Sequence, residues 1–215
     1  MDNKTDLEKI FDFFHEIESL KYKLRFGSSE NKLNESVSAH SWRVAVMALF
    51  LPEKLDIKIN ILHAVKLALT HDLGEYISGD IDERIISSGK ISKAEKKKLE
   101  MQAIEKLSET LPEIRLLWKE FEDCTSEEAK YAAAIDKLET LEHIINSGRE
   151  TYNMPEMIPN YADAAVSKFP RLLPALLHLK EKLKKEFIKG GLPWTEIYDK
   201  IIFPVVCEQR QGRKH

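Results

Sequence analysis

Four residues of this chain have the types and the order expected of a metal site: His40, the adjacent pair His71 and Asp72, and Asp136. Two imidazoles and two carboxylates form a mixed nitrogen and oxygen set that leaves room for waters in an octahedral shell. Such a set suits Mn, Co, Fe, Ni or Zn better than Ca, and Mg only weakly. A divalent ion lowers the pKa of a bound water and polarises a phosphoryl oxygen. The residues therefore predict one divalent transition metal ion that serves the hydrolysis of a phosphate ester.

Three further polar residues are candidates for the same chemistry. Glu75 follows Asp72 by three residues, which places both on one face if the helix continues. Its carboxylate would then act on a bound water. Asp80 is a second acidic residue within reach of the site, and Arg25 carries the planar guanidinium that suits a pair of phosphate oxygens.

Each candidate also has an ordinary structural interpretation. His40 could serve helix packing alone, and the two acidic candidates after the His-Asp pair could be surface carboxylates. The buried charge predicted for Asp136 demands a cation or hydrogen-bond donors, which Lys137 or Arg43 could supply without a metal. A His-Asp pair by itself also arises often by chance. The linked set therefore carries more weight than any single member.

The spacing of apolar residues predicts an all-α fold. Nearly every segment repeats apolar side chains at three- and four-residue steps, and no hairpin signal lies between two β-branched runs. The first helix begins at Thr5, where Thr5 and Glu8 form a capping box, and its apolar stripe is predicted to be core. A second helix runs from about residue 36 or 38 to 51, carries His40 in its first turn and ends before Pro52.

The other ligands lie on two further predicted helices. A helix from near residue 59 through 73 carries the His-Asp pair near its end, and it either breaks near Gly74 or continues to residues 78–79. A capping box of Thr125 and Glu128 opens a helix that Gly148 closes, with Asp136 inside it. Helices are also predicted at about 92–111, 112–121, 161–168 and 171–189, with a last one near Pro193. The lysine run at 96–98 is predicted to be a solvated helix face.

Length and composition favour a single domain spanning residues 1–215. Its core motifs lie within 25–143, and the C-terminal helices at 161–203 are expected to pack on the same domain. The net charge of -3 argues against a nucleic-acid polymer as partner. Cys124 and Cys207 are isolated, which favours a reducing cytoplasm, and neither a signal peptide nor a membrane span is predicted.

The motifs resemble a known family. The order His40, then His71 and Asp72, then Asp136 is similar to that of the HD superfamily of metal-dependent phosphohydrolases. The surrounding sequences resemble its 5'-deoxynucleotidase branch, which includes the bacterial YfbR type and the human HD domain-containing protein 2 type: ESVSAHSWRVAVMA, ALTHDLGEYISGDI and AAAIDKLETL. The resemblance covers about residues 25–143, over half of the chain.

The resemblance implies a role for each candidate. The two histidines and two aspartates would bind one divalent ion. Glu75 would orient or deprotonate the attacking water, and Asp80 would assist at the nucleophile or the leaving group. Arg25, fifteen residues before His40, falls where the family has a phosphate-binding arginine. Phe26 stands where the bacterial type has a tryptophan that packs against the sugar, which leaves the preference for deoxyribose open.

The implied activity is the hydrolysis of (deoxy)nucleoside 5'-monophosphates to nucleoside and phosphate, by a homodimer. Two alternatives remain. One is an HD-type phosphodiesterase, or a hydrolase of nucleoside triphosphates or alarmones, for which His143 and His178 are the candidate additional ligands. The other is a non-catalytic HD scaffold that binds a nucleotide or a protein. Retention of all four ligands and Glu75 speaks against the scaffold.

Overall fold

Helices account for the regular structure of this chain, and the prediction of an all-α fold is confirmed. The computed structural model describes residues 4–25, 35–148 and 155–201. Within these ranges no strand is present, and the extended pairing is limited to an isolated bridge between Leu24 and Ser36. The elements are α1 Asp6–Ile17, η1 Glu18–Lys21, α2 Val37–Lys54, α3 Ile61–Thr70, α4 Glu75–Ser78, α5 Glu83–Ser87, α6 Lys93–Ser108, α7 Glu113–Asp123, α8 Glu127–Ser147, α9 Asp163–Lys168, η3 Pro170–Leu172, α10 Leu173–Lys189 and α11 Glu196–Asp199.

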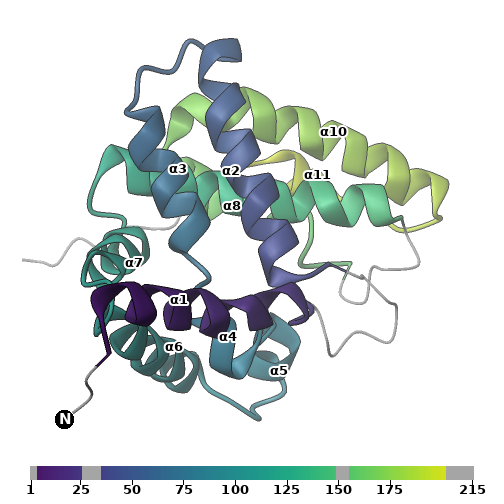
Figure 1. Cartoon of the computed structure of the whole chain (residues 1–215). Coiled ribbons are helices and arrows are strands. Elements are labelled where there is room, and N and C mark those ends of the chain that lie inside the picture. Colours follow the sequence, from purple (N-terminus) through teal and green to yellow (C-terminus); the bar gives the residue numbers. More distant parts are fainter. Residues whose placement is uncertain (1–3, 26–34, 149–154, 202–215) are drawn as a thin grey trace, which may run out of the picture.

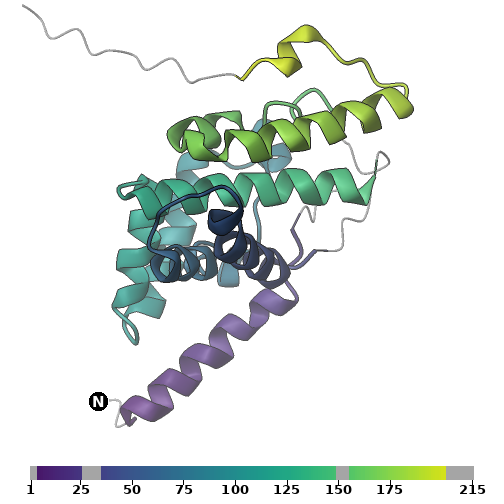
Figure 2. The ribbon, with the colours of Figure 1, turned by 90° about the horizontal axis from the view of Figure 1, so that it is seen from above.

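Helix α8 lies at the centre of the molecule. Figure 2 shows α10, α8 and the α2–α3 pair as successive layers, with α1 reaching outward from the body. Small alanines let the helices approach closely, and the buried apolar residues of α2, α3, α8, α9 and α10 form one continuous cluster. A second cluster joins α1 and η1 to α6 and α7. The central helix therefore presents its long buried face to both neighbouring layers.

Predicted helix boundaries were wrong at the end of α2, at the start of α8 and at the end of α3, which stops at Thr70 rather than at residue 73. Helix α2 continues through Pro52 to Lys54. A proline there has no N–H to donate to the carbonyl of Ala48, and the hydroxyl of Tyr131 donates to that carbonyl instead, at 3.1 Å. Helix α8 begins one residue later than predicted, because the side chain of Ser126, rather than Thr125, accepts the hydrogen bond from the third helical N–H.

The prediction that the whole apolar stripe of α1 is core was also wrong. The capping box at Thr5 is present, but Leu7, Phe11 and Phe14 are 66%, 64% and 53% exposed, whereas Phe13 is buried. The reason is tertiary: α1 reaches outward from the body and leaves this face beside a groove that Trp42 also lines. No described helix has the length and the hydropathy to cross a membrane.

Candidate metal centre

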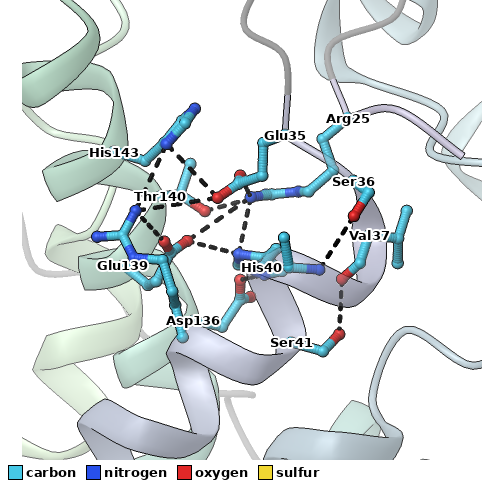
Figure 3. A network of polar contacts seen from close by, with 12 residues as sticks. Arg25, Glu35, Ser36, Val37, His40, Ser41, Asp136, Glu139, Thr140 and His143 are labelled. Atoms are coloured by element: carbon cyan, nitrogen blue, oxygen red, sulfur yellow. Dashed lines mark hydrogen bonds and ion pairs between the residues drawn. The ribbon is translucent and has the colours of Figure 1, made fainter. Parts of the chain in front are cut away.

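The four predicted ligands converge from the starts, ends and middles of three helices. His40 lies in the first turn of α2, which Ser36 caps, and it is fully buried. Asp136 lies in the middle of α8 and is 6% exposed. Nε2 of His40 is 3.1 Å from Oδ1 of Asp136 and 3.7 Å from Oδ2 of Asp72. His40 and Asp136, which are 96 residues apart in the sequence, are thus in direct contact (Figure 3).

The adjacent pair uses the end of a helix rather than its interior. Helix α3 ends at Thr70, so that His71 is its C-cap and Asp72 lies in the turn that follows. Nε2 of His71 and Oδ2 of Asp72 are 3.1 Å apart. Because the turn frees the two side chains from the 100° spacing of helical neighbours, both can point toward one position.

Both histidines present the same nitrogen to this position. Nδ1 of His71 donates to the carbonyl of Ala68 at 2.8 Å, and Nδ1 of His40 contacts Oε2 of Glu139 at 2.5 Å. Nη1 of Arg25 lies 2.8 Å from that same His40 nitrogen, but a nitrogen cannot donate and accept at once. The shorter contact to a carboxylate decides for donation, which directs Nε2 of both rings into the cluster.

The donor set fits a divalent ion. Ligand atoms of His40, His71 and Asp136 lie within 4.8 Å of one another. Nε2 of His71 is buried and makes no hydrogen bond among the described residues, although Oδ2 of Asp72 is 3.1 Å away, and such an atom is costly unless something else binds it. Burial and Arg25 oppose protonation of His40, yet its bonds to Asp136 and Glu139 raise its pKa to about 9. A proton on Nε2 of His40 therefore stands where the ion would bind.

Lys137 does contact Asp136, as the metal-free interpretation required. Its Nζ is 2.9 Å from Oδ2 of Asp136, while Oδ1 faces His40. Burial alone would raise the pKa of Asp136, but Lys137 and the bond from His40 hold it well below its usual value. Arg43 instead pairs with Glu139, at 2.9 Å, and with Glu142. One oxygen of Asp136 is thus neutralised by Lys137, and the other remains directed into the cluster.

Glu75 lies beside the cluster, and of the two predicted courses the helix takes the break near Gly74 rather than the continuation. Glu75 opens the short helix α4 after the turn at residues 71–74. It lines a cavity of about 360 Å³ together with His71, Asp72 and Asp136. Its Oε2 is buried with no hydrogen-bond partner among the described residues, and burial with the charges of Asp72 and Asp80 raises its pKa well above the usual value. A carboxylate that readily takes a proton therefore faces the cavity.

The remaining candidates are placed less directly. Asp80 lies 3.9 Å from Nζ of Lys96. Arg25 is 8% exposed, and its guanidinium donates to Glu35 at 2.8 Å and to Thr140 at 3.0 Å, next to His40 (Figure 3). Phe26 lies outside the described residues. The structure thus places Arg25 at the far nitrogen of His40, where it supports the imidazole and its carboxylate partners.

Sequence reasoning missed three residues of this neighbourhood: Glu35, Glu139 and Lys96. Glu35 and Glu139 group with His40, but Arg25 and Arg43 neutralise them, so this cluster is an ion-pair network. The available signal for Glu139 was its position one helical turn after Asp136.

The lysine run was wrongly predicted to be a solvated face throughout. Nζ of Lys96 lies within 4 Å of carboxylates of Glu75, Asp80 and Glu100, and Lys96 and Lys97 line the same cavity as the candidate ligands. The prediction holds for Lys97 and Lys98, which are both exposed. A run of three helical residues spans most of a turn, so a single description of its exposure could not fit all three.

The two histidines considered for a second metal ion do not join the cluster. His143 lies near Glu35 and Arg43, within the ion-pair network. His178 is exposed on α10. Neither belongs to a group of candidate metal ligands within the described parts of the chain.

The helices bring two histidines and two aspartates around a buried position, with a further carboxylate beside it. This arrangement identifies the chain as an all-α protein with a histidine-aspartate centre. The model of the HD domain family matches residues 17–167, a span that includes the four candidate ligands, Glu75, Asp80 and Arg25. The chain therefore belongs to the HD domain family.

Two named relatives and one solved structure are similar to this chain. The chain is 34% identical over 172 residues to the 5'-deoxynucleotidase HDDC2 of Danio rerio, which covers 77% of this chain and 82% of that protein. It is 32% identical to the human 5'-deoxynucleotidase HDDC2, over 71% of this chain and 72% of that protein. A crystal structure of a predicted metal-dependent phosphohydrolase from Magnetospirillum magnetotacticum shares the fold, with a TM-score of 0.68, 24% identity, and coverage of 89% of this chain and 100% of the other.

Proposed function

We propose that this protein is a metal-dependent phosphomonoesterase that hydrolyses (deoxy)nucleoside 5'-monophosphates to nucleoside and phosphate. The observation that carries the proposal is the gathering of His40, His71, Asp72 and Asp136 with the buried carboxylate of Glu75 in one place. The names of the HDDC2 relatives support the same reaction. Membership of a family of such relatives makes the protein a hydrolase that depends on a divalent metal.

The chain's own residues divide the work between binding and proton transfer. The two Nε2 atoms and the two aspartates would hold the ion, which lowers the pKa of water and polarises a phosphoryl oxygen when bound. Glu75 orients the attacking water and takes its proton, and its raised pKa makes the ionised carboxylate a stronger base. Asp80 assists at the nucleophile or the leaving group. Arg25 lies behind His40 rather than in the lining of the cavity, and contributes its positive charge toward the phosphate from there.

The ligand chemistry limits the class of ion that this site would bind. Two imidazoles in the set favour Co, Mn, Fe, Ni or Zn, with Mg the weaker fit, because Mg prefers oxygen ligands. We expect the purified protein to bind one ion per chain. A stoichiometry of two would favour the phosphodiesterase alternative instead.

One experiment tests the metal, the reaction and the sugar preference together. Deoxynucleoside and ribonucleoside 5'-monophosphates are assayed in matched pairs for phosphate release with Mn, Co and Mg. His71→Ala should lose the bound ion and the activity, whereas His63→Ala should keep both. His63 is a suitable control because it lies on the same helix α3 but bonds to Glu120. If the metal-loaded wild type released no phosphate from any nucleotide while His71→Ala kept its metal content, the proposal would be abandoned.

Glu75 separates an enzyme from a non-catalytic scaffold. Glu75→Gln keeps the size of the side chain but removes the base, so we expect kcat to fall by roughly 10²- to 10⁴-fold while nucleotide binding persists. Ser78→Ala, an exposed change on the same short helix, is the control. Equal turnover by Glu75→Gln and wild type would revive the scaffold.

We further propose that the protein works in the cytoplasm as a homodimer. The isolated cysteines Cys124 and Cys207 support a reducing compartment. The exposed aromatic residues Phe11, Phe14 and Trp42, which line one groove, support a face that a second copy covers. Light scattering should give twice the mass of the chain for the wild type, and Phe11→Asp should shift it toward the monomer. A wild type of one chain's mass at micromolar concentration would contradict the dimer.

A further inference from the structure

A phosphate group in this cavity would meet an excess of negative charge. The carboxylates of Asp72, Glu75, Glu100, Glu122 and Asp136 line it. A phosphate monoester is itself an anion, and like charges repel strongly where little water separates them. Binding therefore requires positively charged side chains that face the cavity, in addition to a metal ion.

Four lysines line this cavity: Lys93, Lys96, Lys97 and Lys137. Two of them, Lys137 and Lys97, have close carboxylate partners. Nζ of Lys137 is 2.9 Å from Asp136. Nζ of Lys97 is 3.2 Å from Glu122 and lies over the ring of Trp118, 6.0 Å from its centroid. Both ammonium groups are thus already bound to a neighbouring carboxylate, which limits their attraction for a ligand.

Lys96 differs from these two in how its ammonium group is held. Nζ donates to the carbonyl of Ile81 at 3.0 Å. Its distances to Glu75, Asp80 and Glu100 are 3.8, 3.9 and 3.6 Å, all longer than the roughly 2.7–2.9 Å of a charge-assisted hydrogen bond. An ammonium group has three donors. One is therefore used at short range among the described contacts, while the charge is held near Glu75 by the surrounding carboxylates.

The position of Lys96 is also fixed. Its side chain is 25% exposed, and α6 packs against α4, the helix that begins with Glu75. The carbonyl bond to Ile81 anchors the ammonium to the segment that follows α4. Long side chains on a free surface lose entropy when they bind a ligand, whereas Lys96 is already ordered beside the cavity.

We propose that Lys96 binds a non-bridging oxygen of the substrate's phosphate group and holds it beside Glu75. This inference rests on the proposed phosphomonoesterase function and adds a residue to it. The ammonium group directs a hydrogen bond to the phosphate oxygen and offsets the repulsion from the carboxylates that surround the cavity. Lys96 is thus a substrate-binding residue on α6, supplied from a different helix than any candidate metal ligand.

A purely structural role makes different predictions. Lys96 also links α6 to the segment after α4 through Ile81 and neutralises neighbouring carboxylates. If that were its whole role, removing the charge would lower stability and metal affinity, and phosphate affinity would fall only as a consequence. If Lys96 binds phosphate, phosphate affinity should fall while metal affinity stays.

The test compares wild type, Lys96→Met, Lys96→Gln and Lys96→Arg, with Lys98→Met as the control. Lys98 lies on the same helix and is exposed. The glutamine variant retains an N–H donor without the charge, and therefore serves if the methionine variant does not fold. Calorimetry of the cobalt-loaded proteins measures affinity for inorganic phosphate, a separate titration of the metal-free proteins measures affinity for cobalt, and steady-state assays give kcat and KM.

We expect Lys96→Met and Lys96→Gln to weaken phosphate binding at least tenfold and to raise KM, with cobalt affinity within twofold of wild type. Lys96→Arg should recover part of the phosphate affinity, and Lys98→Met should match wild type. Unchanged phosphate affinity in both uncharged variants would overturn the proposal. So would a parallel loss of cobalt and phosphate affinity that arginine does not repair.

The same data separate this proposal from the proposed function. A wild type that binds phosphate through Lys96 but hydrolyses no nucleotide would refute the phosphomonoesterase and leave the phosphate site supported. If Lys96→Gln hydrolysed nucleotides as well as the wild type does, the proposed function would stand and the role of Lys96 would be refuted.

Discussion

The contact between Nδ1 of His40 and Oε2 of Glu139 determines which nitrogen of that imidazole faces Asp136. Glu139 is fully buried, and Arg43 holds its other oxygen at 2.9 Å. Carboxylates in this position fix the tautomer and orientation of a histidine that binds a metal. At the scale of single residues, the candidate centre therefore depends on a side chain that contacts no proposed substrate.

Glu139→Gln should weaken metal binding by about 10- to 100-fold. The amide can still accept a hydrogen bond, but it lacks the charge that orients His40 and increases its basicity. Titration of the metal-free protein with cobalt measures the effect. Glu142→Gln, one turn later on α8 and at the edge of the same network, should change the affinity much less. Equal affinity of Glu139→Gln and wild type would exclude a supporting role.

Glu100 should make stability depend on pH. Burial raises its pKa to about 7 against the opposing charge of Lys96, and Asp72 adds to the rise. The folded state then binds more protons than the unfolded chain between about pH 4.5, the ordinary value, and pH 7. Stability from this group is therefore fully present below the ordinary pKa and is lost as the pH rises through 7.

Urea unfolding of wild type and Glu100→Gln at pH 5 and pH 8 tests this expectation. The variant should gain stability relative to wild type between pH 5 and pH 8, since glutamine carries no charge to desolvate. Glu105→Gln, an exposed change on α6, should show no such gain. A stability difference between Glu100→Gln and wild type that is the same at both pH values would contradict the assignment.

At the scale of helices, the turn between α3 and α4 is held close to α6. Gly74 lies in this turn, and a Cβ added to it would lie 3.1 Å from both Cβ and the carbonyl oxygen of Glu100. Its φ of -60° is open to any residue, so the requirement for glycine is one of space. This close approach brings Glu75, the next residue, and Lys96 to the same cavity.

Gly74→Ala should lower the free energy of unfolding by about 1–3 kcal/mol, because the backbone of α6 must move to accept the methyl group. The displacement should also separate Glu75 from Lys96 and reduce kcat. Denaturant unfolding and steady-state assays measure the two effects. Ser78→Ala, four residues on, should stay within about 0.5 kcal/mol of wild type. Wild-type stability in Gly74→Ala would show that the two segments are not tightly packed.

At the scale of the whole molecule, the helices that carry the candidate metal ligands, α2, α3 and α8, also pack together in the hydrophobic core. Buried apolar residues of α2, α3, α8, α9 and α10 form one cluster, which includes Val44, Leu138 and Leu183. Residues 1–215 are accordingly predicted to form one domain with a single unfolding transition. Coincident transitions by circular dichroism and tryptophan fluorescence would support this prediction, and two separate transitions would refute it.

Removal of the metal should lower the thermal midpoint of the wild type. An ion at a hundred times its dissociation constant stabilises the folded state by about 2.7 kcal/mol, which corresponds to roughly 5–10 °C for a chain of this size. Thermal scans with and without a chelator measure the shift. His71→Ala should show little shift, because it lacks a ligand. The same shift in wild type and His71→Ala would place the stabilising ion elsewhere.

The sequence by itself determined the helical class, most helix positions and the types and order of the four candidate ligands. These depend on local patterns: apolar spacing, capping residues and motifs within a few residues. The capping box at Thr5 and the position of Asp136 inside α8 were predictable in this way. Whether the apolar face of each helix is buried could not be predicted, because α1 has the same apolar spacing whether that face is covered or exposed.

Only the tertiary structure decided which nitrogen of His40 faces the cluster, that Arg25 lies among carboxylates, and that Lys96 faces the cavity. These contacts join residues that lie tens of positions apart, such as His40 and Glu139 on α2 and α8. Burial and charge at such contacts depend on how helices pack, which local periodicity does not specify. The sequence therefore determines the types of the ligands, whereas the packing of the helices determines their burial and the charges around them.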